Sequence, residues 1–194
     1  MLNKSTLTIK TLLVFIIGLL TAVVVCLGSY GFFSAKGMRD NMVDIYTNRV
    51  VCMDQIRTVN NAHYSDVNVV RNVLAGKLSA EDALSQIDDN EAKSKEKWKA
   101  YMDTYLLPEE KIIADSVVER LSAFSRPLED VRHDLGSGDK AKLAESVEEL
   151  AAINDILGDS LDQLFSFQAK IADQQYQQSE SNYGRLLRAC SQSC

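Results

Sequence analysis

The chain has 194 residues, of which 46% are hydrophobic and 25% charged, and its formal net charge is −6. It contains nine glycines and two prolines, and no alternating run of β-branched residues is bounded by turn residues, so we predict an all-α protein. The excess of acidic residues argues against a nucleic acid as a partner.

The first predicted element is an apolar segment from Thr11 to Ala35, which contains no charged residue. A helix crosses the hydrocarbon core of a bilayer with about 20 apolar residues, whereas the apolar region of a secretory signal has roughly 7 to 15. We therefore predict an uncleaved transmembrane helix at residues 11–35 that contacts the lipid bilayer.

The flanks of this segment indicate its orientation. Lys4 and Lys10 precede it without an acidic residue, so residues 1–10 are expected in the cytoplasm. Everything after residue 35 then lies outside the membrane, with 19 basic residues against 27 acidic ones.

Three breaks divide the remainder of the chain. The first follows Gly76, where Ser79 and Asp82 have the spacing of a capping box. The second has Pro108 in a first-turn position, and the third is the segment DLGSGDK around Gly136.

These breaks predict four helices, and the third of them contains Pro127, where a kink or local opening is expected. Their predicted ranges are 36–75, 80–106, 109–135 and 139–188. Connections this short make neighbouring helices antiparallel, with Gly76 and Gly136 at the far tip.

Apolar residues recur in all four predicted helices at alternating spacings of three and four, which is typical of a helix-bundle seam. The fourth helix has the seam Leu143, Val147, Leu150, Asn154, Leu157, Leu161, Leu164, Gln168 and Ile171. The third has Val117, Leu121, Phe124, Leu128, Val131 and Leu135. In the second helix, Trp98, Tyr101 and Tyr105 form an aromatic stripe that we expect in the core. The pattern predicts an antiparallel up-down-up-down four-helix bundle that follows the transmembrane helix.

Polar residues interrupt three of these seams at one level, about 20 Å from the tip at roughly 1.5 Å per residue. They are His63, Ser94 and Asn154, and Asp66 and Glu91 lie within a turn of this level; Asn60 is a further candidate site residue. Buried polar groups left unpaired cost roughly 1 to 3 kcal/mol each, so such a layer is either internally hydrogen-bonded or forms a ligand site. Two interpretations stay open: His63 pairs with Asp66 while Asn154 fixes the helix register, or the layer binds a small ligand.

Catalysis is not expected. The chain has two histidines, no glycine-rich phosphate loop and no paired metal-ligand motif, so we predict a protein that is not an enzyme and has no cofactor or metal. Cys190 and Cys194 are interpreted as incidental, although a disulfide between them stays open.

The sequence resembles the four-helix-bundle sensor domain of bacterial methyl-accepting chemotaxis proteins. The short basic N-terminus, the uncleaved span and the long first helix carry this resemblance. It continues in the segments YLLPEEKIIADSVVERLSAF and LGSGDKAKLAESVEELAAINDILGDSLDQLFSFQAKIADQQYQQSESNYGRLL.

The resemblance implies a dimeric, single-pass protein of the bacterial inner membrane whose bundle, residues 36–188, lies in the periplasm. It further implies that this bundle binds a small ligand such as an organic or amino acid and relays occupancy by a helix displacement. Residues 189–194 stand where such receptors begin a second span, which suggests truncation before the signalling domain. Input domains of sensor kinases or cyclases, and an anchored bundle without a small-molecule ligand, are the alternatives.

The resemblance also implies a ligand site nearer the tip. In aspartate and serine receptors, arginines in the distal part of the first helix hold a carboxylate, and Arg71 has a comparable position here. Asn154 would be the polar partner from the fourth helix. Arg120 on the third helix, with Arg126 and Arg132, is a further candidate for an organic acid.

Overall fold

The computed structural model describes residues 9–192, apart from the side chains of residues 41, 44 and 186–192. These residues are helical apart from short connections, so the all-α prediction is confirmed for the described part of the chain. The helices are α1 (Ile9–Ile45), η1 (Tyr46–Val50), α2 (Val51–Leu74), α3 (Ala80–Met102), α4 (Pro108–Ser137) and α5 (Lys140–Gln192). Most of the predicted cytoplasmic segment 1–10 and Cys194 lie outside the described residues, and the side chain of Cys190 is not described.

The chain divides into two compact units, residues 1–43 and 44–194. In the first unit, the stretch Ile9–Asp40 is long enough and apolar enough to cross a membrane, with a mean hydropathy of 2.8. Its large apolar side chains are exposed rather than packed against protein, as expected for residues that face lipid. This helix contains the whole predicted span 11–35.

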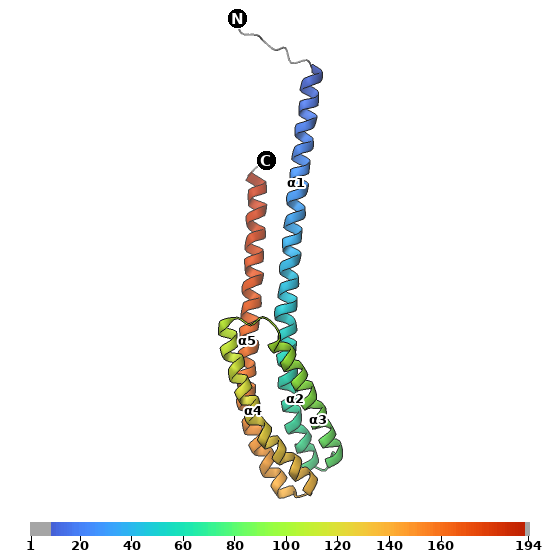
Figure 1. Ribbon diagram of the computed structural model, residues 1–194, viewed down its shortest axis with the longest axis vertical. Helices are drawn as coiled ribbons and strands as arrows, with labels where there is room; N and C mark the ends of the chain where they lie inside the picture. Colours follow the sequence, from blue (N-terminus) through green and yellow to red (C-terminus); the bar gives the residue numbers. More distant parts are fainter. Residues whose placement is uncertain (1–8, 193–194) are drawn as a thin grey trace. The chain divides into compact units, whose positions relative to one another are not determined.

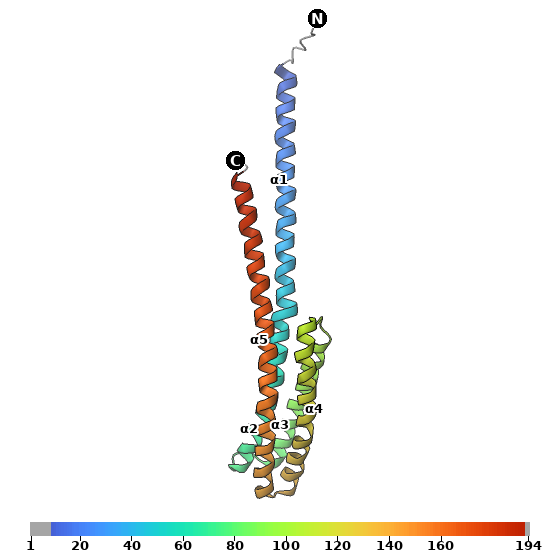
Figure 2. The ribbon, with the colours of Figure 1, turned by 90° about the vertical axis from the view of Figure 1, so that its left-hand side faces the viewer.

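The second unit is a four-helix bundle formed by η1 with α2, α3, α4 and α5 (Figures 1 and 2). The α2 helix packs along α3 and along α5, and α4 packs along α5. In contrast, α3 and α4 approach each other at few positions. The bundle therefore consists of two closely packed hairpins that meet through α2 and α5.

The predicted seams form the core of this bundle. In α5 every predicted seam residue except Ile171 is buried, and in α4 every one except Leu121 is buried. Full burial of a leucine or phenylalanine side chain contributes roughly 1.5 to 3 kcal/mol, so this stripe supplies most of the driving force for packing. The spacing of three and four residues predicted these buried positions, and the prediction is confirmed for all of them except Ile171 and Leu121.

The helix ends follow local rules, with one difference at the tip. The Ser79 side chain accepts a hydrogen bond from the Asp82 backbone N–H at 3.0 Å, which confirms the predicted cap of α3. The α4 helix runs through Gly136 and ends at Gly138, whose φ of 72° is left-handed. Gly138 rather than Gly136 therefore makes the turn, because a residue with a Cβ is strained in that conformation.

The predicted end of the second bundle helix was wrong. The α3 helix stops at Met102 instead of residue 106, because the Thr104 hydroxyl donates to the Tyr101 carbonyl at 2.7 Å and the Thr104 N–H bonds the same oxygen. As a result, Tyr105 leaves the seam and is 76% exposed, whereas Tyr101 is fully buried. Of the two alternatives at Pro127, the local opening is absent, since α4 is helical on both sides of that buried residue, and the kink stays a prediction.

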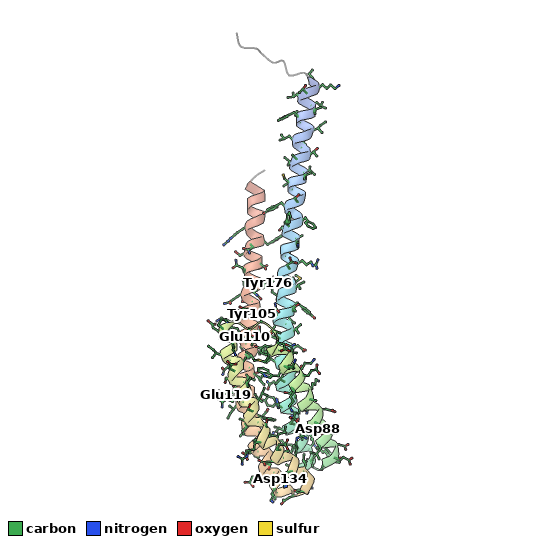
Figure 3. All side chains as sticks on the ribbon, in the orientation of Figure 1. Asp88, Tyr105, Glu110, Glu119, Asp134 and Tyr176 are labelled. Carbon is green, nitrogen blue, oxygen red and sulfur yellow. The ribbon has the colours of Figure 1, made fainter. Side chains whose placement is uncertain are left out.

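A buried polar network closes the end of the bundle at the α3–α4 connection, where Glu110 lies (Figure 3). One Glu110 oxygen accepts from the Tyr101 hydroxyl at 2.7 Å and from the Gln168 amide. The other accepts from the Leu107 N–H at 3.2 Å and lies 3.6 Å from the Arg49 guanidinium. Arg49 also donates to Gln168 at 3.0 Å. One carboxylate thus joins η1, α3, α4 and α5.

The π-helical segment η1 brings Arg49 into this network. Arg49 is 5% exposed, although its flanking residues Asn48 and Val50 are half-buried and exposed. The wider π turn is a local departure from α geometry of a kind that often accompanies a functional or strained position. A spacing pattern based on α-helices does not predict it.

Removing the carboxylate of Glu110 should destabilise the protein strongly, because Arg49 would be left buried without its ion-pair partner. We expect Glu110→Ala to lower the free energy of unfolding by about 3 to 5 kcal/mol in urea titrations followed by circular dichroism. Glu109→Ala is the matched control, since Glu109 is exposed in the same first turn, and it should cost less than about 1 kcal/mol. Equal losses for the two variants would contradict the importance of the buried pair.

Candidate functional site

A groove runs between α3 and α4 because these two helices pack closely with α2 and α5 but not with each other. Its volume is about 290 Å³, at the small end of ligand pockets, which span roughly 300 to 1,000 Å³. The lining residues come from α2, α3 and α4: His63, Glu91, Ser94, Lys95, Trp98, Val118, Leu121, Ser122, Phe124, Ser125, Leu128 and Glu129.

Polar contacts between α3 and α4 bound the groove at both ends. On one side Tyr101 of α3 donates to Glu110 of α4. On the other side Arg132 of α4 donates to Glu91 at 2.9 Å and to Asp88 of α3. The residues that line the groove lie between these two contacts along both helices, so the space between α3 and α4 is held open at a defined place.

His63 forms the floor of the groove from α2. Its Nε2 atom lies 2.9 Å from the Ser94 hydroxyl, and its ring meets the Phe124 ring edge-on with centroids 4.4 Å apart. The side chain is buried, and this desolvation lowers the pKa of His63 to about 4 despite the opposing charge of Glu91. The floor of the groove is therefore uncharged at neutral pH.

Asp66 lies one turn further along α2, on the side of His63 away from Ser94. One of its oxygens accepts from the Asn90 amide at 2.8 Å, and the other is 3.9 Å from the His63 Nδ1 atom. Neither that second oxygen nor Nδ1 has a hydrogen-bond partner among the described residues. Burial raises the pKa of Asp66 to about 7, although the Asn90 hydrogen bond opposes this rise. The pair therefore combines a histidine that resists protonation with a carboxyl group that holds its proton up to a pH of about 7.

The charged side chains at the rim of the groove compensate one another. Glu91 forms ion pairs with Lys95 and with Arg132, and these partners lower its pKa. The Arg132 Nε atom also lies 3.7 Å from Glu129. No charge of either sign on this rim is without a partner of opposite sign.

Three of the predicted site residues meet in the groove, and a fourth supports them. His63, Glu91 and Ser94 line it, and Asp66 lies directly behind His63. Ser94, His63 and Asp66 follow one another at 2.9 Å and 3.9 Å, whereas Glu91 pairs with Lys95 and Arg132. The ligand-binding role of this layer stays a prediction. The His63–Asp66 pairing of the register interpretation is present only as a 3.9 Å approach without a hydrogen bond, and the geometry leaves both interpretations open.

The other four predicted site residues lie elsewhere. Asn60 donates to Asp162 of α5 at 3.5 Å, and the exposed Arg71 pairs with Glu148 of α5 at 3.5 Å. Arg120 is exposed on α4 and does not line the groove. Asn154 is buried on α5, and its Oδ1 atom has no hydrogen-bond partner among the described residues. The arginine-based carboxylate site implied by the resemblance stays a prediction.

Several lining residues were assigned to the core or not considered. Trp98 was expected in the core; it is half-buried and packs against the core, and it also lines the groove. Ser122 and Ser125 are exposed on the α4 face that turns toward α3. Small polar residues beside a seam could have indicated the wall of a groove, but serines that only face solvent produce the same sequence pattern.

The polar side chains that line the groove contact other groups of the bundle. Among residues 9–192 no group of three or more His, Cys, Asp or Glu side chains is placed to hold a metal ion. The hydroxyls of Ser122 and Ser125 bond backbone carbonyls of their own helix, and Ser94 contacts a histidine that is itself neutral.

Comparison with known proteins agrees with this architecture. The sequence model of a family described as a four-helix-bundle sensory module for signal transduction matches residues 6–183. The chain is 23% identical over 171 residues to the methyl-accepting chemotaxis protein NahY of Pseudomonas putida, and this match covers 87% of the chain and 32% of that protein. The chain thus spans about a third of the length of this relative. No solved structure gives a significant match.

The buried pair predicts opposing effects of pH on stability. Between about pH 4 and 6.5, His63 is protonated in the unfolded chain but not in the folded one, so its contribution to stability falls as the pH falls. Between about pH 3.8 and 7, Asp66 retains its proton in the folded state only, so its contribution falls as the pH rises.

Single substitutions should separate these effects. Relative to the unmodified protein, the melting temperature of Asp66→Asn should rise more steeply from pH 4 to 6.5, and that of His63→Gln should fall over the same range. Differential scanning fluorimetry across this range measures both slopes. If the melting temperatures of both variants changed with pH as that of the unmodified protein does, neither His63 nor Asp66 would have a shifted pKa.

Proposed function

Because the chain belongs to the family of four-helix-bundle sensory modules for signal transduction, we propose that its bundle is the ligand-binding input of a chemotaxis-type transducer. The helix Ile9–Asp40 would anchor it in the bacterial inner membrane by a span at residues 11–35. The bundle, residues 36–188, would lie in the periplasm. Two observations support this arrangement: Lys4 and Lys10 precede the span, and the chain is similar to a methyl-accepting chemotaxis protein.

The observation that carries the ligand-binding part of the proposal is the groove between α3 and α4. A four-helix bundle without a ligand function normally fills the space between adjacent helices with interdigitating side chains. Here α3 and α4 instead leave about 290 Å³ between two polar contacts, with apolar and polar groups converging on it. A concave, mostly apolar space with a few placed polar groups is the usual form of a small-molecule site.

The packing of the bundle supplies a route from the groove to α5. A ligand in the groove would contact α3 and α4 together, and each of these helices packs along a partner, α2 or α5. Closing α3 toward α4 would therefore bias how α2 and α5 lie against each other. A ligand that prefers one of two such arrangements shifts the population toward it, and in a homodimer this shift would be relayed as a helix displacement.

A ligand screen on the full-length chain held in amphipol tests this proposal. Trp98 is the single tryptophan of the chain and lines the groove, so its fluorescence should report occupancy. We expect at least one small organic metabolite to change this fluorescence saturably and to raise the melting temperature. Ser125→Phe, which fills the groove, should weaken binding at least tenfold.

Ser160→Phe is the matched control for this substitution. Ser160 lies on α5 outside the groove, and its hydroxyl bonds the carbonyl four residues earlier at 3.3 Å, as the hydroxyl of Ser125 does. The control variant should bind like the unmodified protein. A bundle that is stable but binds no metabolite, or one that binds equally well with Ser125→Phe, would favour a structural role for the groove residues.

A further inference from the structure

The wall of the groove formed by α4 offers hydrogen-bond acceptors. The Ser122 hydroxyl donates to the Val118 carbonyl at 2.9 Å, and the Ser125 hydroxyl donates to the Leu121 carbonyl at 3.3 Å. Both hydrogens are therefore committed to backbone oxygens, while the lone pairs of both hydroxyl oxygens remain available. A partner in the groove would meet these serines as acceptors.

The floor of the groove has the same character. Ser94 either donates its hydroxyl hydrogen to the His63 Nε2 atom or accepts a hydrogen from it, according to the histidine tautomer. In the first case two lone pairs of the Ser94 oxygen stay free, and in the second case one lone pair and the hydroxyl hydrogen do. Under both assignments Ser94 can accept a hydrogen bond from a ligand.

The remaining polar groups on the wall add acceptors more than donors. Glu91 and Glu129 are carboxylates. Among the lining side chains, the other donors are Lys95, which is paired with Glu91, and the indole N–H of Trp98. The cations Lys95 and Arg132 already balance these two acids. A ligand with a net charge would thus enter a site without an unpaired counter-ion, which is unfavourable in a partly desolvated space.

Most of the exposed wall is apolar, since it is formed by Trp98, Val118, Leu121, Phe124 and Leu128. These side chains can cover the body of a ligand but cannot hydrogen-bond with it, apart from the indole N–H. The neutral His63 at the floor supplies no positive charge for a carboxylate.

Resting on the proposed function, we propose that the groove binds an uncharged, largely apolar molecule that carries a hydroxyl or N–H donor. The donor bonds the oxygen of Ser94 at the floor or the oxygens of Ser122 and Ser125 on the wall. The apolar body lies against Trp98 and Phe124. An organic or amino acid anion is disfavoured, because its carboxylate would face acceptors and two glutamates.

Two matched ligand series test this assignment on the full-length chain in amphipol, with Trp98 fluorescence and equilibrium dialysis as readouts. The series share an n-hexyl or a 3-phenylpropyl body and differ in one terminal group: alcohol, methyl ether, carboxylate or ammonium. The alcohol should bind at least tenfold more tightly than the carboxylate and the ammonium. The alcohol should also bind at least about threefold more tightly than the ether, which lacks the donor. Uptake by the amphipol is measured with protein-free amphipol and subtracted.

The preference for the alcohol is measured on the unmodified protein, so it does not depend on whether a variant folds. Ser94→Ala, if its melting temperature is retained, should reduce the difference between alcohol and ether. A second variant, Ser122→Ala, changes an exposed residue and tests the wall in the same way.

The possible failures are distinguishable. Tighter binding of the carboxylate or the ammonium that is lost in Ser125→Phe would overturn the ligand class and leave the groove as the site. If neither series binds while binding of a metabolite from the screen is lost in Ser125→Phe, the ligand class is likewise overturned and the groove remains the site. Binding that persists unchanged in Ser125→Phe would overturn the groove itself, and with it the proposed function.

Discussion

The buried carboxylate of Glu110 is the interaction on which the arrangement of the bundle depends. It joins Arg49 of η1, Tyr101 of α3 and Gln168 of α5 to the first turn of α4, so all four helical segments are fixed relative to one another at that end of the bundle. From there α2 packs along α3 and α5, whereas α3 and α4 diverge until Arg132 bridges them again. The groove is a consequence of this pattern: two polar contacts hold α3 and α4 in place, and neither helix fills the space between them.

The polar residues inside the bundle therefore have two different roles. Around Glu110 every carboxylate oxygen has a donor, although the buried Arg49 Nε atom has no hydrogen-bond partner among the described residues. Around His63 the set is incomplete, since the histidine Nδ1 and one Asp66 oxygen lack hydrogen-bond partners and Ser94 retains acceptor capacity toward the groove. Under the proposed function, the cluster around Glu110 would keep its geometry and the cluster around His63 would respond to a ligand.

Much of the bundle could be predicted from the sequence because its helices obey local rules. The spacing of three and four apolar residues identified the core of α4 and α5, and serine, proline and glycine marked the ends of the helices within a few residues. Glu110 was missed although it lies on the extension of the α4 seam, because an acidic residue in a first turn is usually a solvent-exposed cap. The π turn at Tyr46–Val50 and the exposure of Tyr105 depend on single contacts that periodicity does not encode.

For the site, the common level of His63 and Ser94 could be predicted from the helix lengths. The separation of α3 from α4 is a tertiary property that no single helix reveals.

The position of a bound ligand in the bundle is the most direct test of the central claim. Intermolecular nuclear Overhauser effects can be recorded between the tightest-binding compound and the protein, with the single indole ring of Trp98 as an unambiguous reporter. A ligand in the groove should give strong effects to the rings of Trp98 and Phe124, which line it from opposite helices. Effects confined to Tyr64 and Ile156, exposed residues of α2 and α5 that do not line the groove, would contradict the assignment and place the ligand elsewhere.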